Sequence, residues 1–203
     1  MGMHGQVIPV SEATLRRIHA DPLLVLQVMG NEEELERERQ KAQKAPGLVG
    51  RLFGKKAPAP LPPTEPLVLA EGESEVTDLD KAWHGVHWLL TGSVWEGDWP
   101  LSFILKGGTD VDYDGPWNSA PRTFTPAETR EIADALAQVS DDALRARYRP
   151  EDMMKAEIYP EIWDREPDAE EDPQAYVMSA LADVRAAVNS AVQRGWGLIV
   201  AVD

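Results

Sequence analysis

The stretch AYVMSALADVRAAVNSAVQRGWGLIVAV, residues 175–202, contains the strongest secondary-structure pattern in the chain. Apolar residues recur in it at spacings of four, three, four and four, at Val177, Leu181, Val184, Val188 and Val192. This is the period of a helix with one buried face. Gly195 ends the predicted helix, since glycine readily takes the left-handed conformation that closes helices. Residues 197–202, apolar throughout, then predict a strand.

The N-terminal residues predict a strand that is able to pair with residues 197–202. Gln6 to Val10 is short and contains β-branched residues, and Pro9 places it at a sheet edge or a strand end. Ser11 caps the helix that follows, which runs to about His19. The two ends of the chain are therefore expected to meet in one sheet.

Capping residues mark the helices between these strands. Thr125 to Glu128 forms a capping box with proline at the first helical position, and predicts a helix to about Val139. Ser140 caps a further helix through Tyr148. Residues 79–90 predict another, capped by Thr77 or Asp78 and ended by Gly92, whereas residues 92–121 predict short strands and loops.

Residues 31–66 differ in composition from the rest of the chain. A polar helix is predicted from Glu32 to about Lys44, and residues 37–56 hold seven basic residues against one acid. Residues 57–66 contain five prolines, a density that forbids a regular helix. We therefore predict a single α+β domain over residues 1–203, with helices packed on a small mixed sheet and residues 31–66 as a charged, proline-rich mobile insertion.

Charge and composition exclude several classes of function. The 203 residues carry a formal net charge of −15, so the folded body repels nucleic-acid backbones and anionic membrane surfaces. The basic residues of 37–56 either contact an anionic partner or only solvate an exposed segment. Cysteine is absent, which excludes disulfides and thiolate chemistry. No secretion signal and no apolar run long enough to span a bilayer occurs, so a cytoplasmic protein is expected.

Two histidines form the first candidate site. His84 and His87 are three residues apart on the predicted helix 79–90, close enough to share a metal ion, with Asp80 one turn earlier. Asp80 and His87 are about 10 Å apart along a straight helix, which does not suit one ion. The favoured interpretation is that His87 is a hydrogen-bonded core histidine near Trp83. We predict neither a metal nor a cofactor.

Acidic and aromatic residues form two further candidates. Asp110, Asp112 and Asp114 resemble the start of a calcium loop, but its twelfth position is Pro121 instead of glutamate, so a turn is favoured. Five of the seven tryptophans lie within 35 residues, at Trp83, Trp88, Trp95, Trp99 and Trp117. These side chains either fill the core or form a binding surface, and glycine and aspartate between them indicate partial exposure.

Three segments resemble the YfbM-like family of bacterial proteins of unknown function. They are MGM at residues 1–3, LDKAWHGVHWLLTG at 79–92 and EIYP at 157–160, and the similarity extends through Gly107, Gly108 and the helix after Thr125. The resemblance implies a small cytosolic α+β domain without an established activity or cofactor. It supplies no catalytic residue, although Trp83 and His87 match its central motif.

A non-catalytic binding or regulatory module is the leading hypothesis for function. Its protein partner would meet an acidic surface with exposed aromatic side chains, as in an immunity-type inhibitor that neutralises a basic protein. The competing hypothesis is a divalent-metal-dependent hydrolase or lyase that uses His84, His87 and the Asp110, Asp112 and Asp114 cluster. The candidate binding residues are Trp83, His84, His87, Trp95, Trp99, Asp110, Asp112 and Asp114.

Overall fold

The computed structural model describes residues 2–43, 65–113, 119–167 and 172–202. The strands are β1 (Gly5–Val10), β2 (Thr77–Asp80), β3 (Thr109–Asp110), β4 (Arg122–Phe124) and β5 (Gly197–Val202). The helices are α1 (Glu12–Ala20), α2 (Leu24–Val28), α3 (Glu32–Gln43), α5 (Trp83–Thr91), α6 (Pro126–Gln138), α7 (Asp141–Arg147), α8 (Pro150–Lys155) and α9 (Pro173–Arg194).

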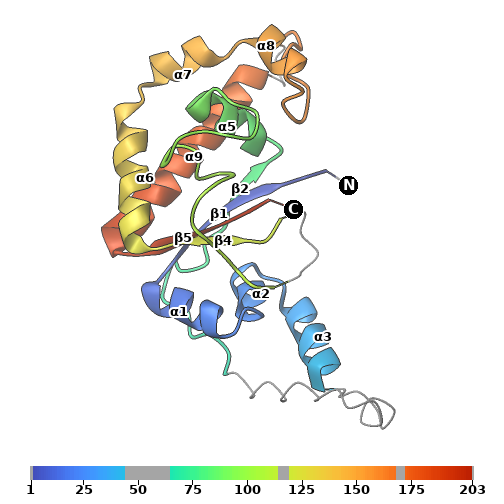
Figure 1. Cartoon of the computed structure of the whole chain (residues 1–203), viewed down its shortest axis with the longest axis vertical. Helices are drawn as coiled ribbons and strands as arrows, with labels where there is room; N and C mark the ends of the chain where they lie inside the picture. The colour runs from blue at the N-terminus through green and yellow to red at the C-terminus, as the bar shows by residue number, and fades with distance from the viewer. Residues whose placement is uncertain (1, 44–64, 114–118, 168–171, 203) are drawn as a thin grey trace.

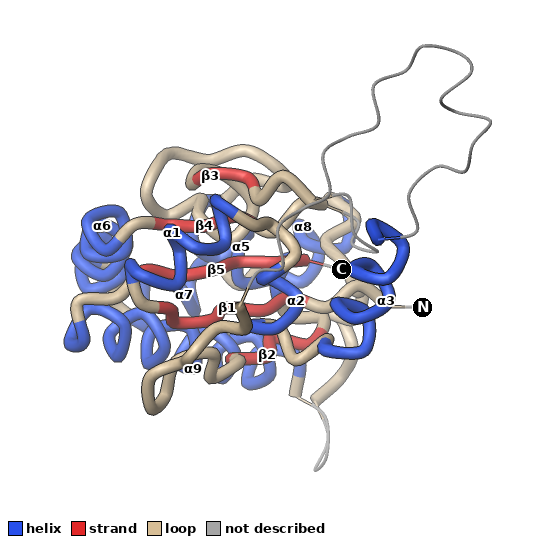
Figure 2. The backbone as a smooth tube through the Cα atoms, turned by 90° about the horizontal axis from the view of Figure 1, so that it is seen from below, coloured by secondary structure: helices blue, strands red, loops and turns tan. Residues whose placement is uncertain are grey.

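Strands β1 and β5 form the centre of the sheet, whose order is β2-β1-β5-β4-β3 (Figure 2). They pair along their whole length, from Gly5 opposite Val202 to Val10 opposite Gly197. The expected pairing of these two segments is therefore confirmed. Pro9 lies beyond the residues of β1 that pair with β2, so its missing N–H removes no ladder bond on that side.

Helices cover both faces of the sheet (Figure 1). Val7, Leu198 and Val200 pack with apolar side chains of α5, α6 and α9, whereas Ile8, Val10 and Ile199 pack with those of α1 and α2. All six residues of β5 are buried as a result. The α+β class is confirmed, but every described strand pair is antiparallel, so the predicted mixed sheet is wrong. Burial on both faces gives β5 an apolar pattern that does not reveal the direction of its neighbours.

The predicted insertion is described only at its two ends. Residues 32–43 form α3, in agreement with the predicted polar helix, and Leu35 on it is buried. Residues 44–64, which hold most of the prolines of the predicted insertion, lie outside the described residues. Where the chain is described again, the side-chain amide of Gln27 bonds both the N–H and the carbonyl of Leu67.

The helix predicted over residues 79–90 begins later than expected. Residues 77–80 form the edge strand β2, and α5 starts at Trp83 without a side-chain cap. Pairing of Thr77 and Asp78 with β1 and burial of Leu79 outweigh the capping preference of Thr77 and Asp78. Gly92 closes α5 in the left-handed conformation, as predicted.

The caps of the longer helices agree with the sequence. Thr125 and Glu128 make both hydrogen bonds of a capping box at the start of α6, and the hydroxyl of Ser140 accepts the N–H of Ala143 in α7. Gly195 ends α9 in the left-handed conformation. These capping residues therefore mark where α6 and α7 begin and where α9 ends.

Gly85 on α5 is required by close packing against Trp163. A β-carbon at Gly85 would lie 2.5 Å from Cη2 of Trp163, and this indole is fully buried with its Nε1 donating to the carbonyl of Ile158. We expect Gly85→Ala to lower the free energy of unfolding by about 2 kcal/mol, because overpacking outweighs the gain of roughly 1 kcal/mol in helix propensity.

Urea denaturation of wild type, Gly85→Ala, Trp163→Phe and the double variant checks this expectation. Phenylalanine lacks the outer indole atoms that the new methyl group would meet, so Gly85→Ala should cost much less in a Trp163→Phe background. Equal costs in both backgrounds, or a stabilising Gly85→Ala, would show that the contact with Trp163 does not limit this position.

Candidate functional site: a loop that displays a tryptophan

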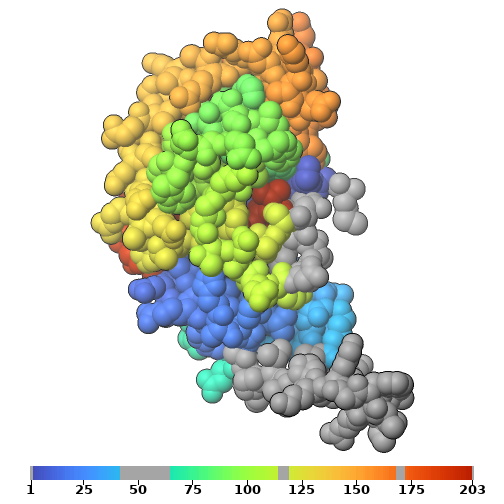
Figure 3. Space-filling view, viewed as in Figure 1, coloured from blue at the N-terminus to red at the C-terminus, as the bar shows by residue number. Residues whose placement is uncertain are grey.

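Two buried histidines of α5 hold the loop that follows the helix. Nε2 of His84 lies 2.8 Å from the carbonyl oxygen of Val94, and Nε2 of His87 lies 3.0 Å from that of Glu96. Both imidazoles are completely buried. The two carbonyls belong to the residues on either side of Trp95. We call residues 93–106 the tryptophan loop; the loop lies at the molecular surface (Figure 3).

Both histidines are neutral near pH 7. Nδ1 of His84 accepts the N–H of Tyr159 at 3.1 Å, so its proton is on Nε2 and points to Val94. Burial lowers the pKa of His84. Burial also lowers the pKa of His87 to about 4, opposed by its bond to the Glu96 carbonyl. Nδ1 of His87 is buried without a described hydrogen-bond partner. The structure therefore uses these side chains as fixed donors in the core.

Trp95 is the exposed ring of an aromatic cluster, in which it lies tilted against both His84 and Trp83. Its ring centroid lies 4.5 Å from that of His84, whose other neighbour is the parallel ring of Trp83 at 4.8 Å. Tyr159 lies on Trp83 with a centroid distance of 5.9 Å. Trp83 is buried, but Trp95 keeps 53% of its surface exposed. The indole of Trp95 is thus packed against the aromatic core on one side and exposed to solvent on the other.

The three segments of the family resemblance meet around Trp83, whose ring lies against Trp95. Nε1 of Trp83 donates to the carbonyl of Met3, and the N–H of Met3 donates to the hydroxyl of Tyr159 at 3.0 Å. A β-carbon on Gly2 would lie 2.9 Å from that same hydroxyl. Met3 and Tyr159 were not among the predicted site residues. The signal that was available was their place in the MGM and EIYP motifs.

Trp99 anchors the second part of the tryptophan loop. Its ring stacks on Phe124 of β4 with centroids 5.9 Å apart, and its Nε1 donates to Glu131 of α6 at 2.6 Å. The side chain remains 39% exposed. Lys106 bonds Glu96 at 2.9 Å across the loop. Trp88 is half-buried on α5, and Trp117 lies outside the described residues.

The acidic candidates are not brought together with the histidines. Asp110, on β3, and Asp112 are exposed, and Asp114 lies outside the described residues. Asp80 accepts the hydroxyl of Tyr176 and pairs with His4. Within the described ranges, no three His, Asp or Glu side chains are close enough together to hold a metal ion. With both nitrogens of His84 bonded to the backbone, the geometry favours a positioning role for this residue over ligation.

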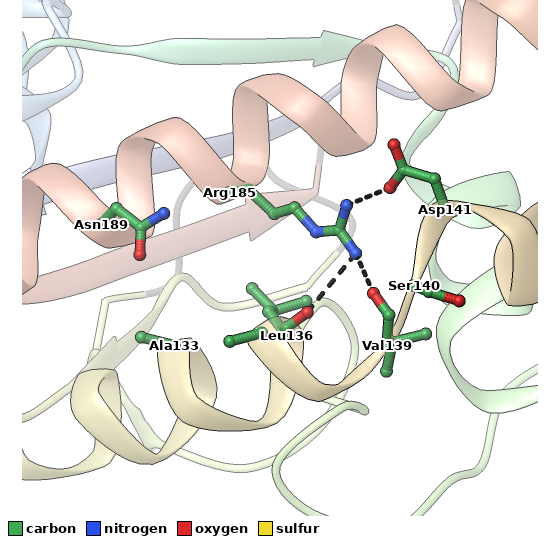
Figure 4. A pocket seen from close by; sticks show the side chains of 8 residues that line it. Ala133, Leu136, Val139, Ser140, Asp141, Arg185 and Asn189 are labelled. Atoms are coloured by element: carbon green, nitrogen blue, oxygen red, sulfur yellow. Dashed lines mark hydrogen bonds and ion pairs between the residues drawn. The ribbon is translucent and has the colours of Figure 1, made fainter.

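A cavity of about 330 Å³ between α6 and α9 has a structural explanation (Figure 4). Arg185 of α9 crosses it and donates to the carbonyls of Leu136 and Val139 at the C-terminal end of α6. The guanidinium also pairs with Asp141 at the start of α7. Arg185 therefore joins two helix ends to α9, and its charge is already compensated.

Comparison with known proteins agrees with the resemblance in the sequence. The crystal structure of YfbM from Escherichia coli, a protein of unknown function, matches with a TM-score of 0.56 and 16% identity over 98% of this chain and 99% of that one. At this identity the match shows a shared fold. No curated protein matches the chain. None of the described helices is long and apolar enough to cross a membrane. The family model described as "Domain of unknown function (DUF1877)" matches residues 1–201, and the chain belongs to this family.

Proposed function

We propose that the protein is a non-catalytic binding module and that Trp95 is the anchor that enters its protein partner. The observation that carries this proposal is the pair of buried imidazoles bonded to the carbonyls on both sides of an exposed indole. Tryptophan is among the residues most enriched at energetic centres of interfaces. The fold keeps this one exposed, although a hydrogen-bonded core surrounds it on the protein side.

The support beneath Trp95 lowers the cost of binding. An interface loses free energy when flexible loops and side chains become ordered, by roughly 0.5–1.5 kcal/mol for each side chain. Here the backbone on both sides of the indole is already held, and the ring rests on His84. A partner pocket for the indole therefore meets a preformed anchor.

The charge of the protein favours a basic partner. Glu96 and Asp98 are exposed next to the two loop tryptophans, and the whole chain has a formal net charge of −15. Complementary charge increases the association rate and disfavours acidic competitors. An immunity-type inhibitor that neutralises a basic protein in the cytoplasm has these properties, and this is the form of the proposal that we favour.

Affinity measurements on Trp95→Ala test the proposal. Partners captured by the wild-type protein are identified and purified, and the dissociation constant of each is measured with both proteins. Loss of an anchor of about 2 kcal/mol weakens binding roughly thirtyfold. The indole is half exposed, so the circular dichroism and the midpoint of unfolding should change little.

Trp196→Ala is the matched control. Trp196 is a partly exposed tryptophan between α9 and β5, where it packs under Arg194. Its loss should leave the affinity unchanged. If Trp95→Ala and wild type bind every captured partner equally, Trp95 is not the anchor. If Trp196→Ala weakens binding as strongly, the effect is not specific to the tryptophan loop.

A further inference from the structure

A groove lies beside the start of β2, one of the two edge strands of the sheet. Strand β2 pairs with β1 on one side and is the last strand of the sheet on the other, beside α9 (Figure 2). The groove between this strand and α9 has a volume of about 400 Å³. From the sheet side it is lined by Pro9 of β1, by Glu75 and Val76 just before β2, and by Thr77 and Asp78 of β2. From the helix side it is lined by Asp183, Ala186, Ala187 and Ser190.

Most of the α9 side chains that line the groove are short. The lining residues of α9 are spaced by three, one and three positions, which places them on one face of the helix. Ala186 is exposed and Ser190 partly exposed, so short side chains leave room above the helix. On the other wall, Val76 keeps 40% of its surface exposed. An extended backbone fits such a space better than a helix, because its side chains alternate between the groove and solvent.

Carboxylates determine which extended segment the groove accepts. Glu75, Asp78 and Asp183 line it, and no lysine or arginine is among its lining residues. An edge strand exposes backbone N–H and C=O groups that accept another strand unless charges repel it. At the end of β2 the N–H of Asp80 is bonded to the carboxylate of Asp78 and the carbonyl of Leu79 to Ala82, so an added strand pairs along the part before Leu79. Acidic walls repel a second copy of this acidic protein at the same edge, whereas a strand with lysine or arginine side chains is attracted.

We propose that this groove binds an extended basic segment of a partner protein, which adds as a strand to the free edge of β2. Backbone bonds to the edge supply affinity, and pockets for alternate side chains supply specificity, as in other cases of strand addition. The basic side chains meet Asp78, Asp183 and Glu75. The site goes beyond the proposed function, since it shares no residue with the tryptophan loop.

Binding of a labelled peptide tests the groove directly. The probe is the fluorescein-labelled hexapeptide Lys-Val-Lys-Thr-Lys-Val, and its anisotropy is measured against the full-length protein at physiological salt. The peptide Glu-Val-Glu-Thr-Glu-Val should not bind. Ala186→Phe fills the groove without changing charge and should weaken binding of the basic peptide at least fivefold, and Asp183→Asn should do the same.

Matched variants separate groove binding from general attraction to an acidic protein. Ala175→Phe places the same ring at an exposed position of α9 outside the groove, and Asp134→Asn removes an exposed charge from α6; both should bind like wild type. Trp95→Ala should also bind like wild type, so the result is independent of the tryptophan loop. Equal binding by Ala186→Phe and wild type, absence of binding at millimolar peptide, or protein self-association blocked by Ala186→Phe would each overturn the proposal.

Discussion

Glu73→Ala is expected to lower the free energy of unfolding by about 3 kcal/mol. The Glu73 side chain is only 7% exposed, and its two oxygens accept the backbone N–H groups of Ser11 and Ala70, each at 2.8 Å. Removal of the carboxylate leaves both donors without this acceptor and releases the segment before β2 from the start of α1. Urea denaturation at pH 7 measures the loss.

Two variants and a pH series control this prediction. Glu71→Ala removes an exposed carboxylate two residues away and should change stability by less than about 0.5 kcal/mol. Burial raises the pKa of Glu73, but hydrogen bonds from Thr14, Ala70 and Ser11 outweigh it and lower the pKa below the usual value of 4.5. The contribution of Glu73 is therefore present above pH 4.5 and lost as pH falls through the lowered pKa. If Glu73→Ala is as stable as Glu71→Ala, the carboxylate does not hold these segments together.

The second large effect is a loss of stability between pH 6.5 and pH 4. The pKa of His87 is about 4 in the folded protein because of burial, whereas an unfolded histidine titrates near 6.5. Between these values the unfolded chain binds a proton at this position and the folded chain does not, so falling pH favours unfolding. The difference corresponds to a loss of roughly 3 kcal/mol across this range.

Denaturation curves of His87→Gln and wild type across this range identify the group. His87→Gln should be less stable than wild type at pH 7, because the bond to Glu96 is lost, but its stability should fall less steeply as pH decreases. His84, which also has a lowered pKa, keeps part of the slope. The same slope in His87→Gln and wild type would assign the acid sensitivity to other groups.

Most of the fold was predictable because its strongest signals are local. The period of α9, the glycine at its end and the capping box of α6 each depend on a few neighbouring residues, and each has the expected structure. Strand β2 was missed for the opposite reason. Thr77 and Asp78 are good caps in isolation, and only their pairing with Val7 and Gln6, about seventy residues away, makes them a strand.

The geometry around Trp95 was less accessible from the sequence. The spacing of His84 and His87 shows that their side chains are neighbours, but imidazole spacing alone does not distinguish a metal pair from two donors to a backbone. That distinction depends on where residues 94–96 fold back, in a segment rich in glycine and aspartate that has no regular period. Likewise, composition does not separate buried Trp83 from exposed Trp95; their positions on a helix and on a loop do.

The central pairing of β1 with β5 also has a consequence for how the chain folds. The two strands are separated by almost the entire described sequence, so the middle of the sheet closes only after a very long loop has formed. Such non-local contacts slow folding, and during synthesis β1 has to wait for β5 to be made. Until then, the apolar faces of β1 and of its helices α1 and α2 lack their main partner, and this interval is when the protein is most exposed to aggregation.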